Sequence, residues 1–195
     1  VFGGGDGDGQ GAAGTVHSST VLLKDGVRIL RGENGGGIVY GGGNGDKGDI
    51  DDSGVTFNVD NTTVRVEGGL IQGDVYAGGK KNSSTGTADV ILSGGEIGGG
   101  AGDTTGATND AATVKTGTIT VDTDSLNVGG KLLGGNAETS NLSLTSKVTR
   151  LDGTKFGGFD FLKAEGTTSV IGGFTDANVG TSLTLNGKGT LIAPS

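Results

Sequence analysis

The chain has 195 residues, of which 45 are Gly and one is Pro, and it contains no Cys, Met or Trp. The absence of Cys excludes a disulfide framework and thiol chemistry, and the single Pro excludes collagen, which needs Pro-rich repeats with Gly at every third position. The net charge of −8 disfavours nucleic acid and anionic membrane surfaces as partners, because both attract basic faces. No apolar run approaches the roughly 20 residues of a membrane-spanning helix, so we expect no membrane insertion by this segment.

A five-residue motif recurs along the chain. Val-Phe-Gly-Gly-Gly occupies 1–5, Val-Tyr-Gly-Gly-Gly occupies 39–43 and Val-Tyr-Ala-Gly-Gly occupies 75–79, at spacings of 38 and 36 residues. A second motif, Gly-Gly-x-(Ile/Leu), is found at 35–38, 68–71, 94–97 and 129–132. Self-similarity at a period of roughly 20–50 residues is typical of repeat architectures.

The segments around these motifs have the pattern of β-strands. Apolar and polar residues alternate with period two, as in a strand with one buried face, at 55–59, 64–66, 119–121, 142–144 and 183–185. Helix is nearly excluded, because Gly interrupts every window with helical periodicity. We therefore expect an almost entirely β chain.

In chain order, the pattern predicts short strands separated by polar or glycine-rich loops. The expected strands are 1–2, 20–23, 27–30, 55–59, 63–67, 88–92, 96–97, 114–121, 126–133 and 142–151. The expected loops include a turn at 60–62, an acidic loop at 44–54, a polar loop at 80–87 and a further loop at 98–111. Four of the six Phe residues lie between 156 and 174, so we expect 152–195 to form capping rungs at the end of the same domain.

Strands this short need neighbours on both sides, because isolated pairs are marginal in water. Winding the chain into layers about 4.8 Å apart supplies those neighbours, with Val and Ile inside and Gly where the chain turns. The predicted fold is an all-β, right-handed parallel β-solenoid with glycine-rich corners and loops, of roughly eight turns with ~20–25 residues each. Because the sequence starts inside a motif, we expect 1–195 to be one solenoid and a fragment of a longer chain.

The repeated strings resemble the passenger (β-helix) region of bacterial autotransporters and related giant surface adhesins. They are the motif at 39–43, the string Arg-Val-Glu-Gly-Gly-Leu-Ile-Gln-Gly-Asp-Val-Tyr-Ala-Gly-Gly at 65–79 and Ser-Leu-Thr-Leu-Asn-Gly-Lys-Gly-Thr-Leu-Ile at 182–192. The resemblance implies an extracellular stalk or adhesin on the bacterial cell surface, and it transfers no functional residues. The expected partners are host or environmental glycans or surface proteins. End-to-end self-association into an extracellular filament is the alternative.

The central motif also predicts a ligand-binding surface. If equivalent turns align, Phe2, Tyr40 and Tyr76 form an aromatic column with ring centroids no more than about 7 Å apart. Aromatic rings beside Asp and Asn side chains suit sugars, so carbohydrate is the expected ligand class. The loops that follow the three motifs are expected to contribute further contacts.

Two acidic loops are candidate calcium sites, and we expect no other cofactor. Both follow a central motif and place oxygen ligands at alternate positions before a Gly, as calcium loops do. Their candidate ligands are Asp6, Asp8, Asp49, Asp51 and Ser53. Asp and Gly are also the favoured residues of ordinary turns, so a solvated turn is the alternative for both loops.

A polysaccharide-degrading enzyme is the catalytic alternative, since many β-helices cleave acidic polysaccharides. Such an enzyme needs two carboxylates about 5–10 Å apart across one cleft. The sequence offers two pairs, Asp51 with Asp52 and Asp122 with Asp124. The only His, His17, has no Cys or second His with which to share a metal. Polygalacturonase-like enzymes also carry a Gly-His-Gly and an Arg-Ile-Lys motif, and this sequence contains neither, so we expect no enzymatic activity.

Overall fold

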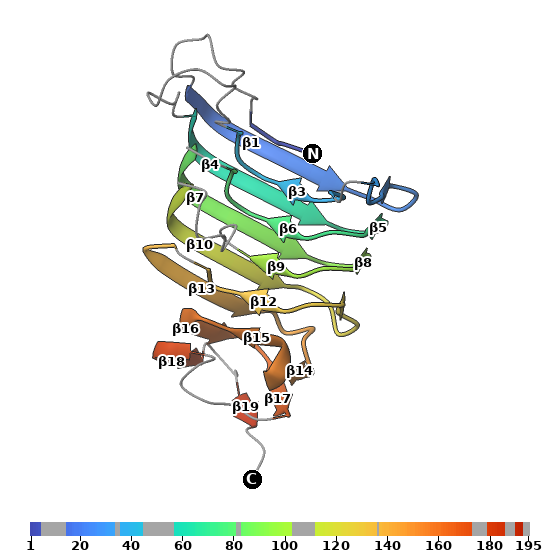
Figure 1. Ribbon diagram of the computed structural model, residues 1–195. Coiled ribbons are helices and arrows are strands. Elements are labelled where there is room, and N and C mark those ends of the chain that lie inside the picture. Colours follow the sequence, from blue (N-terminus) through green and yellow to red (C-terminus); the bar gives the residue numbers. More distant parts are fainter. Residues whose placement is uncertain are drawn as a thin grey trace.

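The protein is almost entirely β-structure in the part of the chain that the structure describes. This computed structural model describes residues 1–4, 15–33, 36–44, 57–80, 83–102, 112–135, 137–172, 179–185 and 190–192. In these residues, the single helical segment is the 3-10 turn η1 (Gly153–Lys155). Consequently none of the described segments is a helix with the length and apolar character needed to cross a membrane. Strands from successive turns stack in parallel, which is consistent with a β-solenoid (Figure 1).

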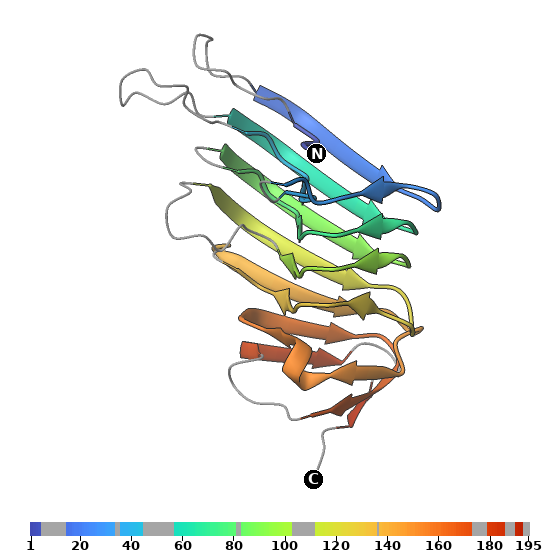
Figure 2. The same ribbon diagram turned by 45° about the vertical axis from the view of Figure 1, so that its right-hand side comes forward.

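The longest sheet has seven strands, one from each successive turn of the chain. Its order is β1 (Thr15–Leu23), β4 (Phe57–Val66), β7 (Ser83–Leu92), β10 (Thr113–Val121), β13 (Thr139–Leu144), β16 (Phe159–Ala164) and β18 (Val179–Leu185). Figure 2 shows these strands stacked from the N-terminal to the C-terminal end. The step between paired residues varies, from 43 positions between Val21 and Val64 to 20 between Leu142 and Leu162.

Three smaller parallel sheets complete the turns. One contains β2 (Arg28–Ile29), β5 (Leu70–Ile71), β8 (Glu96–Ile97) and β11 (Asn127–Val128). The second contains β3 (Val39–Tyr40), β6 (Val75–Tyr76), β9 (Ala101–Gly102), β12 (Leu132–Leu133) and β15 (Phe156–Gly157). The third contains β14 (Arg150–Asp152), β17 (Thr167–Ile171) and β19 (Thr190–Ile192).

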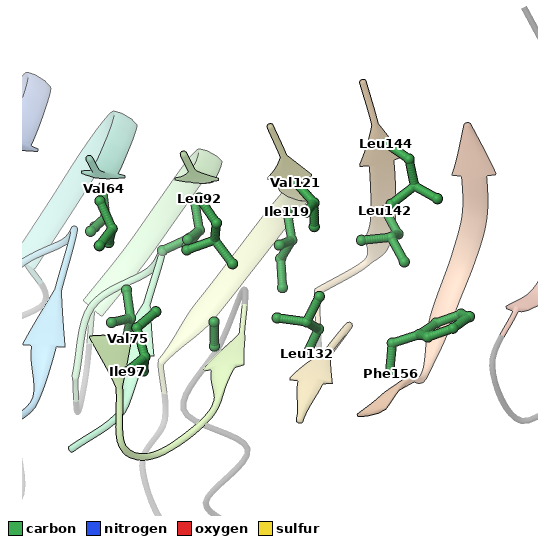
Figure 3. Packing of buried hydrophobic residues seen from close by; sticks show 14 of the residues in the cluster. Val64, Val75, Leu92, Ile97, Ile119, Val121, Leu132, Leu142, Leu144 and Phe156 are labelled. Carbon is green, nitrogen blue, oxygen red and sulfur yellow. The ribbon is translucent and has the colours of Figure 1, made fainter. Parts of the chain in front are cut away.

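Inward-facing side chains form columns in which each residue lies over its equivalent in the next turn. From the long sheet, two columns are Val21, Val64, Val90, Ile119, Leu142 and Leu162, and Leu23, Val66, Leu92, Val121, Leu144 and Ala164. They face a third column of Val39, Val75, Ala101, Leu132 and Phe156. Figure 3 shows the two sides meeting in one apolar core. Each fully buried Val, Leu or Ile contributes about 1.5–3 kcal/mol, so the core is the main stabilising element.

Two expected strands are interrupted in the structure: 126–133 contains β11 and β12 with residues 129–131 between them, and 142–151 contains the end of β13 and the start of β14 with residues 145–149 between them. Three segments expected as a turn or loops contain strand residues. The expected turn at 60–62 is the middle of β4, because β1 and β7 pair with this segment on both sides. The expected loop at 80–87 includes the start of β7, and the loop expected at 98–111 includes β9. In each case, stacking on a neighbouring turn outweighs the local preference of polar or Gly-rich residues for loops.

The Phe residues near the C-terminus have different environments. Phe156 and Phe159 are buried core residues, whereas Phe161 is exposed on the outer face of β16. Phe174 lies outside the described residues. Strands β16 and β18 continue the long sheet, and the capping role of 152–195 stays a prediction.

Substitution of Gly69 tests how closely the turns approach. Gly69 has φ 84°, and a Cβ there would lie 2.6 Å from the Val27 carbonyl oxygen and 2.9 Å from that of Lys24. Gly26 has the same kind of backbone conformation, with φ 85°, but a Cβ there meets nothing within 4 Å. Gly26→Ala should cost about 1–2 kcal/mol from backbone strain, and Gly69→Ala should cost more because the layers must move apart. Urea denaturation of both variants measures the difference. Equal losses would show that the layers do not constrain Gly69.

Candidate functional site

Phe2, Tyr40 and Tyr76 form the aromatic column that the repeated motif predicts. The ring centroids of Phe2 and Tyr40 lie 4.9 Å apart with an interplanar angle of 7°, and those of Tyr40 and Tyr76 lie 5.4 Å apart with an angle of 25°. Parallel pairing places the rings one above another, since Tyr40 pairs with Tyr76 and bridges to Phe2. The predicted centroid separations are confirmed.

The middle ring of this column is buried. Tyr40 is 7% exposed, and its two ring faces stack on Phe2 and Tyr76, which are themselves only partly exposed. The column therefore presents little ring face to solvent and resembles an extension of the core. A ligand-binding role for the three residues stays a prediction.

Tyr76 is held in place by Asp74, which precedes it in the same turn and also bonds to the next turn. Asp74 accepts hydrogen bonds from the Tyr76 hydroxyl and, at 2.7 Å, from the Gly100 backbone N–H of the next turn. Burial is the main cause that raises the pKa of Tyr76, followed by the charge of Asp74. The phenol is therefore a neutral donor at physiological pH, and the Asp74 carboxylate links two layers beside the column.

Buried hydroxyl groups connect the aromatic motif to the long sheet. Ser19 Oγ donates to the Gly41 carbonyl at 2.8 Å, and Thr62 Oγ1 donates to the Ala77 carbonyl at 2.7 Å. Ser19 and Thr62 are paired neighbours in β1 and β4, so the same link recurs one turn later. These bonds fix the segments after Tyr40 and Tyr76, and they satisfy carbonyl groups that would otherwise be costly to bury.

All five candidate calcium ligands, Asp6, Asp8, Asp49, Asp51 and Ser53, lie outside the described residues. Within the described ranges, no group of three or more His, Cys, Asp and Glu residues is arranged to hold a metal ion. His17 lies beside Asp60, with 2.8 Å between Nδ1 and Oδ2, and both side chains are exposed. Calcium binding by the two loops stays a prediction.

Asp122 and Asp124 are each engaged by the following turn. Asp122 accepts from Lys147 Nζ at 2.8 Å and from Thr145 Oγ1 at 2.9 Å. Asp124 accepts from the backbone N–H and the hydroxyl of Thr149 at 2.8 and 2.6 Å. These hydrogen bonds lower the pKa of both carboxyl groups, and the largest contribution comes from Lys147 for Asp122 and from Thr149 for Asp124.

A glycosidase needs one carboxyl with a raised pKa as its acid, so this geometry favours a role in linking successive turns. Asp52, from the other candidate pair, lies outside the described residues.

The structure contains a surface groove that the sequence analysis missed. It has a volume of about 450 Å³ and crosses β10, β13 and β16 on the outer face of the long sheet. Its lining residues are Thr118, Thr120, Asn141, Leu142, Ser143, Phe161, Leu162 and Lys163. The only sequence signal is Phe161 itself, an aromatic residue at an outward position between buried Leu162 and partly exposed Asp160. A second, more open depression of about 400 Å³ is lined by Arg31, Leu70, Gln72, Glu96 and Gly98.

Comparison with known proteins found no matching family model, no similar curated protein and no similar solved structure.

Tyr40→Ala tests whether the aromatic column is structural. The substitution removes both ring stacks from a buried position and should cost about 3–5 kcal/mol. Leu133→Ala is the matched control. Leu133 lies in β12, in the same column as Tyr40 of the sheet that contains β3, β6, β9 and β12, but its side chain is 47% exposed. This substitution should cost under about 1 kcal/mol. Chemical denaturation measures both values, and a small loss for Tyr40→Ala would contradict a structural column.

Asp89→Asn tests the electrostatics of the outer face. Partial burial raises the pKa of Asp89, against an opposing hydrogen bond from Thr118. The folded state then holds the proton of Asp89 more tightly than the unfolded state does. Stability therefore falls as pH rises from the pKa of this carboxyl in the unfolded state through its raised pKa in the folded state. At pH 7 Asp89→Asn should therefore raise the melting temperature slightly, and the gain should disappear below about pH 4. Asp122→Asn is the control of opposite sign, because the lowered pKa of Asp122 makes its charge stabilising at pH 7. Melting curves measure both variants at the two pH values. A change in melting temperature of the same sign for the two variants at pH 7 would contradict this assignment.

Proposed function

We propose that this chain is a structural and adhesive segment of a bacterial cell-surface protein. In this proposal it forms a right-handed parallel β-solenoid with glycine-rich corners, it is not catalytic, and it displays loops that contact glycans or surface proteins. The observation that supports it best is the continuous parallel stack, in which seven strands of one sheet pair turn upon turn.

Such a stack is suited to a mechanical role. Each layer is joined to the next by main-chain hydrogen bonds and by side chains in continuous columns. Each turn advances the stack by about 4.8 Å, so length grows with repeat number and without a larger core. An extended, stiff element of this kind can hold a binding surface away from the cell.

The outer side chains suit contact with a hydrated partner. Two outward columns of the long sheet are mostly hydroxyl and amide groups, namely Ser18, Asn61, Thr87, Thr116 and Thr139, and Thr20, Thr63, Asp89, Thr118 and Asn141. Groups that both donate and accept hydrogen bonds match the hydroxyl groups of sugars. The resemblance to autotransporter passengers supports an extracellular location.

End-to-end self-association is the second candidate, because the outermost strands of a sheet can pair with another chain. In the part of the chain that the structure describes, β1 and β18 occupy the two ends of the long sheet. A second copy that paired with either strand would extend the sheet into a filament. Negative-stain images of purified protein distinguish this candidate, since an adhesive monomer gives single particles.

A binding assay tests the adhesive proposal. Purified protein applied to an array of glycans and to immobilised surface proteins should bind at least one of them. The same preparation incubated with pectin-like polymers should release no reducing ends. Release of reducing ends would replace the adhesive function with an enzymatic one, and failure to bind any glycan or protein would remove the adhesive part of the proposal.

A further inference from the structure

The outer groove on the long sheet is built from two columns of side chains. One wall is Thr118, Asn141 and Phe161, and the other is Thr120, Ser143 and Lys163. Leu142 and Leu162 lie between the walls, and their side chains are fully buried in the core. The floor is therefore the backbone of β13 and β16, and the groove runs across the strands, along the direction in which the turns stack.

The groove combines an apolar ring with hydrogen-bonding groups. Phe161 is 37% exposed and is the one aromatic residue among the large apolar side chains that are exposed in the described ranges. Next to it stand the Asn141 amide and, across the groove, the Ser143 hydroxyl and the Lys163 ammonium. A concave site with one apolar surface and a few convergent polar groups is the usual composition of a small-ligand subsite.

Several of these groups are held in position before any ligand arrives. Asn141 Nδ2 donates to the Gly117 carbonyl at 3.1 Å, and the Thr118 hydroxyl donates to Asp89. Lys163 Nζ lies 2.9 Å from Glu165 Oε1. The side chains stand on paired strands of the longest sheet, so ordering them when a ligand binds would cost little free energy.

The chemistry of the groove identifies the ligand class. A peptide that adds to a sheet needs free main-chain N–H and C=O groups, whereas those of β13 are used by β10 and β16 on its two sides. What the groove offers is an aromatic ring, hydroxyl groups and an amide. A pyranose has a matching C–H face and a rim of hydroxyl groups.

From this geometry we infer that the groove binds a linear polysaccharide that lies along the stack, with one pyranose ring on Phe161. Asn141 and Ser143 bond its hydroxyl groups, and Lys163 contacts a hydroxyl or a carboxylate. This inference rests on the proposed adhesive function and adds the site and the ligand class to it. Adjacent turns repeat at about 4.8 Å, so the neighbouring sugar units lie beside the Asn141 and Thr118 side chains of the same wall.

Titration with three soluble oligosaccharides tests the site: a β-linked glucan, a mannan and an oligogalacturonate. Wild-type protein should bind at least one of them, and Phe161→Ala should weaken that binding at least tenfold without changing the melting temperature by more than a few degrees. Phe161→Tyr should retain the binding, because it keeps the ring. Leu133→Ala is the matched control, since it removes an exposed apolar side chain from a different sheet, and it should bind like wild type.

The outcomes separate the two proposals. Wild-type binding that persists in Phe161→Ala would overturn this groove as the site and leave the adhesive function in place. Absence of binding to all three oligosaccharides by the wild-type protein would overturn the groove as a glycan site, and the adhesive function would then depend on binding to surface proteins. Selective loss of oligogalacturonate binding in Lys163→Gln would support the groove as the site and identify its ligand as an acidic glycan. Loss of glucan or mannan binding in Phe161→Ala alone would support the groove as the site and identify its ligand as a neutral glycan.

Discussion

The parallel register between successive turns is the constraint on which the rest of the structure depends. Val64 lies opposite Val90, and Ile119 lies opposite Leu142, so apolar side chains meet inside every layer. A slip of one residue would move the whole inward set to the solvent face. The same register stacks Tyr40 on Tyr76 and aligns the two walls of the outer groove. The core, the aromatic column and the candidate binding surface are therefore consequences of one pairing scheme.

Close approach of the layers explains why glycine is concentrated at particular positions. A Cβ on Gly42 would lie 2.5 Å from the Gly79 backbone nitrogen, and one on Gly73 would lie 2.6 Å from the Gly37 carbonyl oxygen. At these positions the limit comes from the backbone of the neighbouring turn, so any side chain would separate the layers. Glycine costs chain entropy on folding, and the stacked main-chain bonds and aliphatic columns offset this cost.

The sequence predicts the local pattern well and the contacts between turns less well. Period-two strands such as 119–121 and 142–144 lie where the alternation places them, and the aromatic column follows from a motif repeated in three successive turns. The segment 60–62 has turn-forming residues and yet lies within β4, because pairing on both sides outweighs local preference. Burial of Tyr40 cannot be predicted from its own motif alone, because the rings that cover it come from other turns. The outer groove is the extreme case, since residues from three turns form it and no short segment contains its pattern.

The separation of inner and outer faces bears directly on function. From β1 to β16, the inward apolar residues of the long sheet pack in the core, whereas an outward residue can change without affecting the packing beneath it. Phe161 occupies an outward position between fully buried Leu162 and partly exposed Asp160, and packing of the core does not require an aromatic ring there. An exposed aromatic side chain gains little for folding and adds apolar surface in contact with water. Its position in a groove, beside an amide and hydroxyl groups held by the sheet, is the observation on which the proposed glycan site rests. The fold supplies the rigid framework, and the outward columns are where binding specificity can be encoded.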